Sequence, residues 1–277
     1  MVSTALLEKK LRGDGLMHPV IASTQKSLWM KEFDVAEHEL CHALLPRAAS
    51  FAHIPLSGFQ VGAIAKGDSG NLYLGANLEF PRTAIAHTIH AEQAAFTNAW
   101  MNGEQGISDI FVTATPCGHC RQFLNELDSS STLKIWLGSK RFLLKSLLPE
   151  DFGPADLGVS KGLMDNNVPE RCLTLADAYS RSYAPYTHSR SAVKITTNSD
   201  NIYFGSYVEN AAFNPSLPPL QSALIMALLN QEDLKEIKVV ELMEASTNTL
   251  IQHEAVAHFC STIIPGAHFR SSDPYHT

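Results

Sequence analysis

The pattern of apolar and polar positions predicts helices and strands in alternation along the first half of the chain. Residues 35–51 carry apolar side chains at helical spacing, and Pro55 marks the end of that helix. Residues 61–65 and 72–75 alternate on either side of a glycine-containing turn, which predicts a β-hairpin. The same reasoning predicts helices over 90–100 and 117–127 and strands over 109–114 and 133–137. Strands that alternate with helices after one antiparallel hairpin indicate an α/β domain with a mixed sheet.

Two segments beside this region have weaker patterns. Residues 1–35 carry scattered apolar positions such as Leu6, Leu11 and Trp29, which predict weakly amphipathic helix. Residues 149–169 are rich in Asp, Gly and Pro, a composition typical of a linker. We therefore expect an N-terminal helical segment at 1–35, a first domain at 36–150, a linker at 151–170 and a second domain at 171–277.

The second half of the chain partly repeats the first. At an offset of 130 positions, residues 45–79 align with 175–209 without a gap, and nine of the 35 pairs are identical. Helix, proline, strand, turn and strand recur in the same order. The repeat indicates duplication of one α/β unit.

Composition and charge restrict the classes of function. The chain has 277 residues, 45% of them hydrophobic and 18% charged, which suits one large or two modest domains and is too apolar for a disordered chain. Lys and Arg number 21 against 28 Asp and Glu, for a net charge of −7. This balance argues against a protein that coats nucleic acid or anionic lipid, so we expect neither nucleic acid nor a membrane as a partner.

The apolar runs and the cysteines bear on the compartment. The longest apolar run, residues 223–229, is far shorter than the ~20 residues that span a bilayer. Charged residues at 8–10 precede any secretory core. Five cysteines, an odd number, fit a reducing cytosol better than a disulfide framework, and we expect a cytoplasmic protein.

The strongest chemical signal is His90-Ala91-Glu92 followed by Pro116-Cys117-Gly118-His119-Cys120. Two thiolates and an imidazole make a three-ligand zinc set that leaves the fourth tetrahedral position for water, as in catalytic sites. The cysteine pair begins a predicted helix, where the dipole favours thiolate. Glu92 is badly placed to bind the same ion but can take a proton from zinc-bound water, whose pKa zinc lowers to about 7.

Other interpretations of the cysteines remain open. A Cys-x-x-Cys pair also occurs in structural zinc sites and in disulfide isomerases, although the latter place Trp before the first Cys, where this chain has Thr115-Pro116. We interpret His119 as a spacer or as a support for the ligands, the alternative being that it binds the metal itself. The other three cysteines are expected to be small buried hydrophobes: Cys41, Cys172 and Cys260.

His-x-Glu followed by Pro-Cys-x-x-Cys is similar to the signature of the zinc-dependent nucleoside and nucleobase deaminases. Within that superfamily the chain resembles the bacterial homodimeric cytidine deaminases from about residue 40 to 255. The segments that carry the resemblance are Pro55–Ala63, Gly75–Glu79, Thr88–Gln93, Thr115–Gln122, Asp151–Pro154, Gly205–Pro215 and Leu217–Gln221.

The resemblance implies a fold, a reaction and a cofactor. The fold would be a three-layer α/β/α sandwich with a mixed sheet, duplicated within the chain. The reaction would be hydrolytic deamination of cytidine and 2′-deoxycytidine to uridine and 2′-deoxyuridine in pyrimidine salvage. One Zn²⁺ per chain would be held by His90, Cys117 and Cys120. Glu92 would move protons from water to the ring N3 and later to the departing amino group, while hydroxide attacks C4.

The resemblance also implies substrate contacts. Asn77 and Glu79 would bind the ribose, although a polar strand end would account for them equally well. Phe59 would lie beside the base. The Ala91 N–H and the Thr115 carbonyl would bind the base edge. In a homodimer, Phe152 would cover the base pocket of the partner chain, the alternative being that it anchors the linker to its own domain.

The second domain is expected to be a zinc-free copy. Aligned with one extra residue after the glutamate, Gln221-Ser222-Ala223 falls where the first domain has His90-Ala91-Glu92, and no Cys-x-x-Cys follows. In the resembled family such a copy packs the dimer and helps to close the site.

Two alternative functions remain. Deamination of a base in RNA or DNA fits the motif but not the net charge of −7 or the lack of a Lys/Arg run. A cytosolic thiol oxidoreductase could use Cys117 and Cys120 without zinc and without Glu92. A purely structural zinc module is disfavoured because only three good ligands are present.

Overall fold

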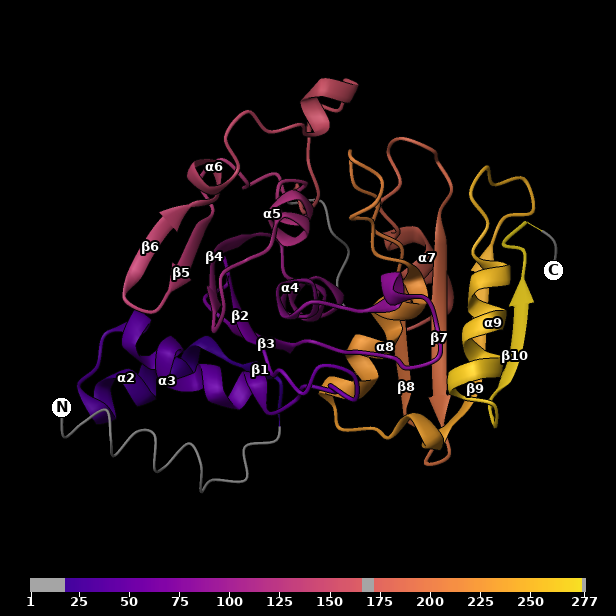
Figure 1. Ribbon diagram of the computed structural model, residues 1–277, viewed down its shortest axis with the longest axis horizontal. Coiled ribbons are helices and arrows are strands. Elements are labelled where there is room, and N and C mark those ends of the chain that lie inside the picture. The colour runs from indigo at the N-terminus through magenta and orange to yellow at the C-terminus, as the bar shows by residue number, and fades with distance from the viewer. Residues whose placement is uncertain (1–17, 166–171, 276–277) are drawn as a thin grey trace.

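The computed structural model describes residues 18–165 and 172–275, in which two α/β units follow one another along the chain (Figure 1). Helix α2 confirms the second part of the expected N-terminal helical segment, whereas Leu6 and Leu11 lie outside the described residues. Up to residue 165 the elements are β1 (Val20–Ile21), α2 (Ser23–Phe33), α3 (Glu37–Ala49), β2 (Gly62–Gly67), β3 (Leu72–Ala76), η1 (Ile85–His87), α4 (Ala91–Met101), β4 (Ile107–Val112), α5 (Gly118–Leu124), β5 (Lys134–Leu137), β6 (Lys140–Leu143), α6 (Leu144–Leu147) and η2 (Pro154–Leu157). From residue 172 they are α7 (Leu175–Arg181), β7 (Ser191–Thr197), β8 (Ile202–Ser206), α8 (Pro219–Leu229), η3 (Leu234–Glu236), β9 (Ile237–Glu244), α9 (His253–Ile263) and β10 (His268–Ser272).

The first unit is a mixed sheet between two helical layers. The strand order is β1-β3-β2-β4-β5-β6, with β2 antiparallel to β3 and β4 parallel to β5. Because side chains alternate along a strand, β2 turns Ile64 toward Leu40 and Leu44 of α3, and turns Ala63 and Ala65 toward α4. The predicted hairpin and the predicted three-layer α/β/α arrangement are both confirmed.

Glycine lets both helices approach the sheet closely. A Cβ on Gly62 would lie 2.4 Å from the backbone nitrogen of Ala49 in α3. A Cβ on Gly75 would lie 2.1 Å from the backbone nitrogen of Ala95 in α4. Contacts this short are not found for real side chains, so α4 can rest on β3 only because residue 75 has no side chain.

The second unit repeats this architecture. Its strand order, β8-β7-β9-β10, matches β3-β2-β4-β5, and again the last pair is parallel. A register shift follows Lys66 in β2 and Thr196 in β7, positions that are 130 residues apart. Gly205 lies against α8 as Gly75 lies against α4, and the hydroxyl of Ser206, on the opposite face, donates to a carbonyl of α7. The duplication predicted from the sequence is confirmed.

The predicted alignment of the two zinc-relevant segments was wrong. Helices α4 and α8 are both eleven residues long, and their N-caps are His90 and Pro218. The backbone pairs Leu78 with Ile89 in the first unit and Val208 with Leu217 in the second. Pro218-Pro219-Leu220, and not Gln221–Ala223, therefore stands where the first unit has His90-Ala91-Glu92.

The error has a simple structural cause. Nine residues, 80–88, separate Glu79 from Ile89, whereas seven, 210–216, separate Glu209 from Leu217. The second unit has a shorter loop, where the sequence alignment assumed an insertion. Neither Pro218 nor Leu220 offers an imidazole or a carboxylate, so the conclusion that this unit lacks the ligand set is unchanged.

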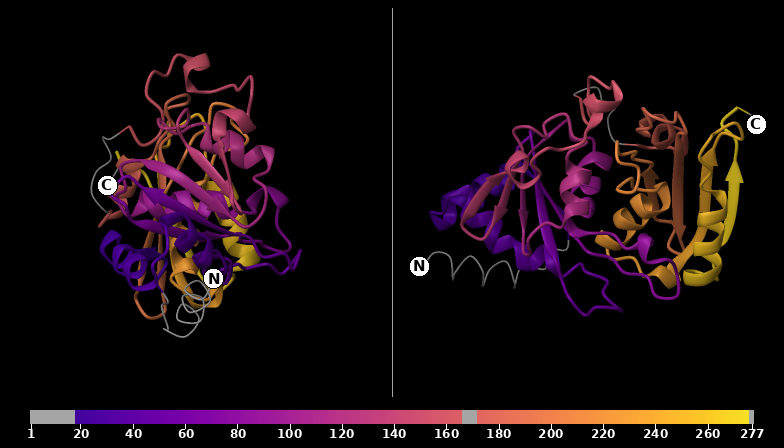
Figure 2. Two further views of the ribbon diagram at one scale, coloured as in Figure 1. Left: turned by 90° about the vertical axis from the view of Figure 1, so that its left-hand side faces the viewer. Right: turned by 45° about the horizontal axis from the view of Figure 1, so that its top comes forward.

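The two units share one hydrophobic core. Helices α4 and α8 pack against each other between the two sheets (Figure 1), and the right-hand view of Figure 2 shows the two units side by side. The described part of the expected linker includes η2. Further along the linker, the buried Leu163 pairs with Leu127. Here the Asp128 N–H donates to the Leu163 carbonyl at 2.9 Å, and α5 ends at Leu124, three residues earlier than predicted. None of the described helices is long and apolar enough to cross a membrane.

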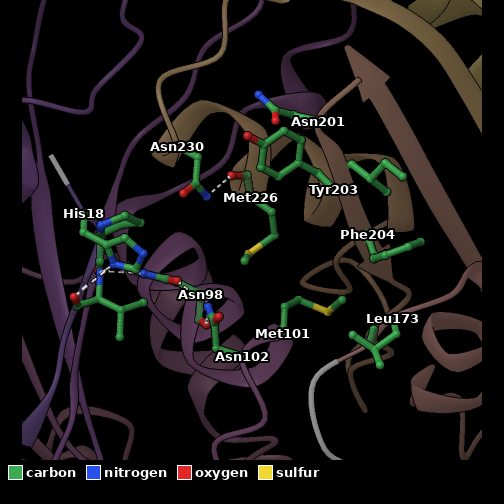
Figure 3. Close-up of a pocket in the computed structure, with 14 residues that line it drawn as sticks. His18, Asn98, Met101, Asn102, Leu173, Asn201, Tyr203, Phe204, Met226 and Asn230 are labelled. Carbon is green, nitrogen blue, oxygen red and sulfur yellow. Dashed lines mark hydrogen bonds between the residues drawn. The ribbon is translucent and has the colours of Figure 1, made fainter. Parts of the chain in front are cut away.

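A cavity of about 430 Å³ lies between the units at the C-terminal ends of α4 and α8 (Figure 3). Met101 and Asn102 of the first unit face Met226 and Tyr203 of the second across it. His90 is at the other end of α4, so this cavity is separate from the predicted zinc ligands.

Candidate active site

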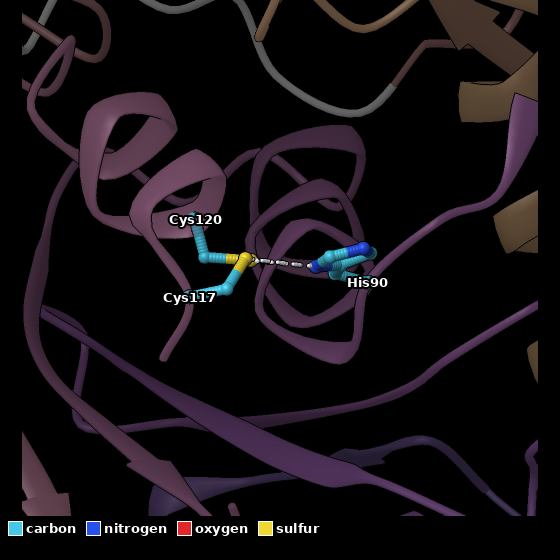
Figure 4. Close-up of side chains that lie close together, drawn as sticks. All are labelled: His90, Cys117 and Cys120. Atoms are coloured by element: carbon cyan, nitrogen blue, oxygen red, sulfur yellow. Dashed lines mark hydrogen bonds between the residues drawn. The ribbon is translucent and has the colours of Figure 1, made fainter. Parts of the chain in front are cut away.

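Two helix N-termini meet at the predicted zinc ligands. His90 is the N-cap of α4, and Cys117 is the N-cap of α5, which follows β4 after a short loop. Cys120 lies within the first turn of α5 and is buried, whereas Cys117 is exposed. The two thiols and the imidazole converge from the two helices (Figure 4).

The donor atoms have the spacing of a metal site. His90 Nδ1 lies 3.2 Å from Cys120 Sγ and 3.3 Å from Cys117 Sγ, and all three donors lie within 4.8 Å of one another. In tetrahedral zinc with bonds of about 2.3 Å to sulfur and about 2.0 Å to nitrogen, neighbouring donors are about 3.5 Å apart. Among residues 18–165 and 172–275 this is the sole group of three His, Cys, Asp or Glu side chains that could hold a metal ion. The residues present therefore fit one zinc ion.

The electrostatics of the thiols favour a bound cation. The hydrogen bond with Cys120, together with His90 and nearby backbone N–H groups, outweighs the effect of burial and lowers the pKa of the Cys117 thiol to about 4. The same pairing, with burial, raises the pKa of Cys120. One negative charge thus forms readily on the pair, and a divalent cation would stabilise the second.

Glu92 lies beside the ligands without belonging to them. It occupies the first turn of α4, and only 4% of its surface is exposed. Burial raises the pKa of this carboxyl, while its own backbone N–H and His90 act in the opposite direction. Because it also contacts Cys120, Glu92 is a buried acid–base group next to the metal donors.

Gln93 supports His90 and was missed by the sequence reasoning. Its side-chain oxygen accepts a hydrogen bond of 3.1 Å from the His90 N–H, and its amide nitrogen lies 3.3 Å from His119 Nε2. The signal was present, because a glutamine three residues after an N-cap often bonds back to it. His119 lies outside the group of three donors, as expected for a supporting residue.

The backbone brings Asn77 and Glu79 next to the zinc ligands. Leu78, between them, exchanges two hydrogen bonds of 2.9 Å with Ile89, the residue before His90. Ala91 is the first residue of α4, so its N–H has no acceptor within the helix. Thr115 is exposed in the loop before Cys117.

In this structure Asn77 and Glu79 hold the loop that carries Phe59. Asn77 accepts from the Val61 N–H at 2.8 Å and donates to the Phe59 carbonyl at 2.9 Å. Glu79 accepts from the backbone and side chain of Ser57. Burial raises the pKa of Glu79, but these hydrogen bonds outweigh it and leave the pKa below its ordinary value. Phe59 itself is 61% exposed.

Phe152 extends from the loop that follows α6. Phe152 is 46% exposed, and its carbonyl accepts hydrogen bonds from the side chains of Gln122 (2.8 Å) and Asn125 (3.3 Å). The backbone of this loop is thus attached to α5, and its aromatic ring is free to contact another molecule.

Comparisons with known proteins identify relatives of this chain. Two family models described as the cytidine and deoxycytidylate deaminase zinc-binding region match residues 35–134 and 144–258. The chain is 46% identical to a cytidine deaminase of Vibrio vulnificus over 81% of its length and 79% of the relative's. It is also 46% identical to one of Pectobacterium carotovorum, over 79% and 76%. A crystal structure of cytidine deaminase from Mycobacterium tuberculosis, 30% identical, covers 43% of this chain and 99% of its own, with a TM-score of 0.40.

The second model match falls on the unit that lacks the ligand set, which agrees with descent of both units from one deaminase domain. Together the two matches cover most of the chain, and the relatives align over more than three quarters of their own length. With the three donors and the buried Glu92 in place, the chain belongs to the cytidine and deoxycytidylate deaminase family, as the His-x-Glu and Pro-Cys-x-x-Cys motifs implied.

Proposed function

We propose that this protein is a zinc-dependent enzyme that hydrolyses cytidine and 2′-deoxycytidine to uridine and 2′-deoxyuridine with release of ammonia. The observation that carries the proposal is the convergence of His90, Cys117 and Cys120 beside the buried carboxyl of Glu92. Curated relatives named cytidine deaminase support the choice of substrate. A place in pyrimidine salvage follows from this reaction.

The chemistry divides between the cation and the chain. Zinc held by His90, Cys117 and Cys120 would supply a Lewis acid, which lowers the pKa of water to about 7. Glu92 accepts one proton of the attacking water and gives it to N3 of the ring. It then takes the remaining proton from the new C4 hydroxyl and gives it to the amino group, which leaves C4 as ammonia as the C4 carbonyl forms. Burial suits this role because a raised pKa lets one carboxyl both accept and donate near neutral pH.

The chain also orients the nucleoside. The Ala91 N–H at the start of α4 and the carbonyl of Thr115 would bind the base edge, one as donor and one as acceptor. Phe59 would stack on the base. Asn77 and Glu79, which lie beside Ile89, already accept hydrogen bonds from the loop 56–61. They would bind the ribose through the donors and acceptors of their side chains that this loop does not use.

Ultraviolet spectroscopy tests the proposal directly. Purified protein is given cytidine, 2′-deoxycytidine or a single-stranded oligonucleotide that contains cytosine, with and without a zinc chelator. We expect conversion of both nucleosides, loss of conversion after zinc removal, and no change in the oligonucleotide. Failure to convert either nucleoside, with zinc bound, would contradict the proposal; conversion of the oligonucleotide alone would favour the nucleic-acid alternative.

We also propose a cytoplasmic homodimer in which each base pocket is completed by Phe152 of the partner. The support is the exposure of Phe59 and Phe152 near the site, and free cysteines throughout the described chain agree with a reducing compartment. Mixing Glu92→Ala and Phe152→Ala chains tests the shared site. If Phe152 acts in trans, one site of the heterodimer has both residues and activity returns; a verified heterodimer that stays inactive contradicts it.

A further inference from the structure

A carboxyl of the first unit is buried among groups of the second. Glu126 follows the last residues of α5, and none of its surface is exposed. Its Oε1 accepts hydrogen bonds from the hydroxyls of Tyr183 (2.9 Å) and Tyr186 (2.6 Å). Its Oε2 accepts from the backbone N–H of Ala211 at 2.8 Å. All three donors are neutral and all three belong to the zinc-free unit.

A buried carboxyl such as Glu126 requires hydrogen-bond donors at both of its oxygens. Burial raises the pKa of Glu126, and the nearby carboxylate of Glu209 raises it further, while the hydrogen bonds from Tyr186, Ala211 and Tyr183 lower it. A buried carboxyl is tolerated only when its oxygens find donors, and losing one donor leaves the group partly unsatisfied. The hydrogen bonds to Glu126 therefore allow little change in geometry, and a contact of this kind can fix the position of α5.

The same part of the second unit holds α5 at a second point. Asn210 donates from its side chain to the carbonyl of Gln122 at 3.0 Å, and the Gln122 side chain donates back to Asn210 at 3.4 Å. Gln122 comes two residues after Cys120 in α5. The short helix that begins at Cys117 is thus attached to the zinc-free unit at Gln122, and the chain just after the helix is attached at Glu126.

The duplication identifies the counterpart, in the first unit, of the segment that contains Asn210 and Ala211. Glu209 is the counterpart of Glu79, and both carboxylates accept from two successive backbone N–H groups, those of Leu56 and Ser57 in the first unit and those of Tyr186 and Thr187 in the second. Residues 209–211 therefore correspond to the segment that begins at Glu79. In the unit without the ligand set, this segment contacts α5 of the other unit.

We propose that Glu126, Tyr183 and Tyr186 are positioning residues through which the zinc-free unit holds α5, and with it Cys117 and Cys120, at the correct distance from His90. The inference rests on one part of the proposed function, which is that His90, Cys117 and Cys120 bind zinc. It gives the second unit a defined task at the metal site of its own chain.

The rate of zinc release tests the inference without any substrate. Holoenzyme is mixed with a chromogenic chelator, and release is followed for the wild type, Tyr183→Phe, Tyr186→Phe and the double variant. Tyr203→Phe is the matched control, because the Tyr203 hydroxyl donates to Glu232 at 2.8 Å in the same unit but beside the cavity at the far end of α4. Thermal unfolding confirms that each variant is folded at the assay temperature.

We expect the double variant to release zinc about tenfold faster than the wild type, at the low end of the effects seen when groups that support metal ligands are removed, and Tyr203→Phe to match the wild type. Equal release from the double variant and the control, whatever their unfolding temperatures, would overturn the inference. If the double variant is unfolded, the two single variants decide in the same way. A protein that binds zinc but fails to convert cytidine would contradict the proposed function and leave this comparison intact.

Discussion

Gly75 sets the distance between α4 and β3, and its replacement by alanine tests whether that distance controls the activity. The added Cβ would lie 2.1 Å from the nitrogen of Ala95 and 2.6 Å from the carbonyl oxygen of Ala91. Both are backbone atoms, so no side chain can rotate away. Since carbon contacts are comfortable only from about 3.5 Å, α4 must shift by roughly 1 Å and carry His90 and Glu92 with it. A misplacement of that size costs about 10²-fold in rate, and we expect kcat/KM of Gly75→Ala to fall by about that factor.

The second unit supplies the matched control. A Cβ on Gly205 would lie 2.1 Å from the nitrogen of Ala223 and 2.4 Å from the carbonyl oxygen of Pro219, which is the same clash against α8. Overpacking of this kind costs about 1–3 kcal/mol in free energy of unfolding, so both variants should lose stability to a similar extent. Only Gly75→Ala moves a helix that begins at a zinc ligand.

The assay combines kcat/KM for cytidine, zinc content and thermal unfolding for the two variants. We expect similar decreases in unfolding temperature, of about 2–4 °C for each kcal/mol lost, and a large activity loss in Gly75→Ala alone. Equal activity in the two variants would refute the claim that the packing of α4 on β3 positions the acid–base group. So would wild-type kcat/KM in a Gly75→Ala protein that is measurably destabilised.

Three other substitutions test separate parts of the account. Glu92→Gln should keep its zinc, because Glu92 is not among the three donors, and should lower kcat by about 10²–10⁴-fold; more than about a tenth of the wild-type rate would contradict its role. Cys117→Ala should lose tightly bound zinc, measured by metal analysis, and full metal content would contradict the ligand set. Burial raises the pKa of Glu241, but the hydrogen bonds and charges of Lys194 and Arg270 outweigh this effect and leave the pKa below its ordinary value. The stability from this contact is therefore fully present above the ordinary carboxyl pKa of about 4.3 and is lost as the pH falls through the lowered value. Glu241→Gln should therefore flatten the acid side of a plot of unfolding temperature against pH, and an unchanged slope would contradict that assignment.

Local signals account for most of what could be predicted from the sequence. The alternation around residues 62–67 and 72–76 marks one face for α3 and the other for α4, and the observed hairpin follows it. The ligand set was recognisable because residue type and spacing alone carry the chemistry of His90, Cys117 and Cys120.

The features that escaped prediction depend on contacts between distant parts of the chain. The shorter loop at 210–216 has no local signature, and it became visible only when Val208 was seen to pair with Leu217. Glu126 and Tyr183 are 57 positions apart in sequence, and the sequence around either residue does not predict their hydrogen bond. The early end of α5 likewise comes just before Leu127, which pairs with Leu163, 36 residues further along the chain.

The measurement that tests the central claim most directly is a titration of the zinc-free protein with zinc, in which deamination of cytidine and bound metal are followed together. We predict that activity rises in proportion to bound zinc and stops rising at one zinc per chain, because His90, Cys117 and Cys120 form one site and the second unit has Pro218 and Leu220 in the matching places. Activity without zinc, or a rise that continues to two zinc ions per chain, would contradict the account.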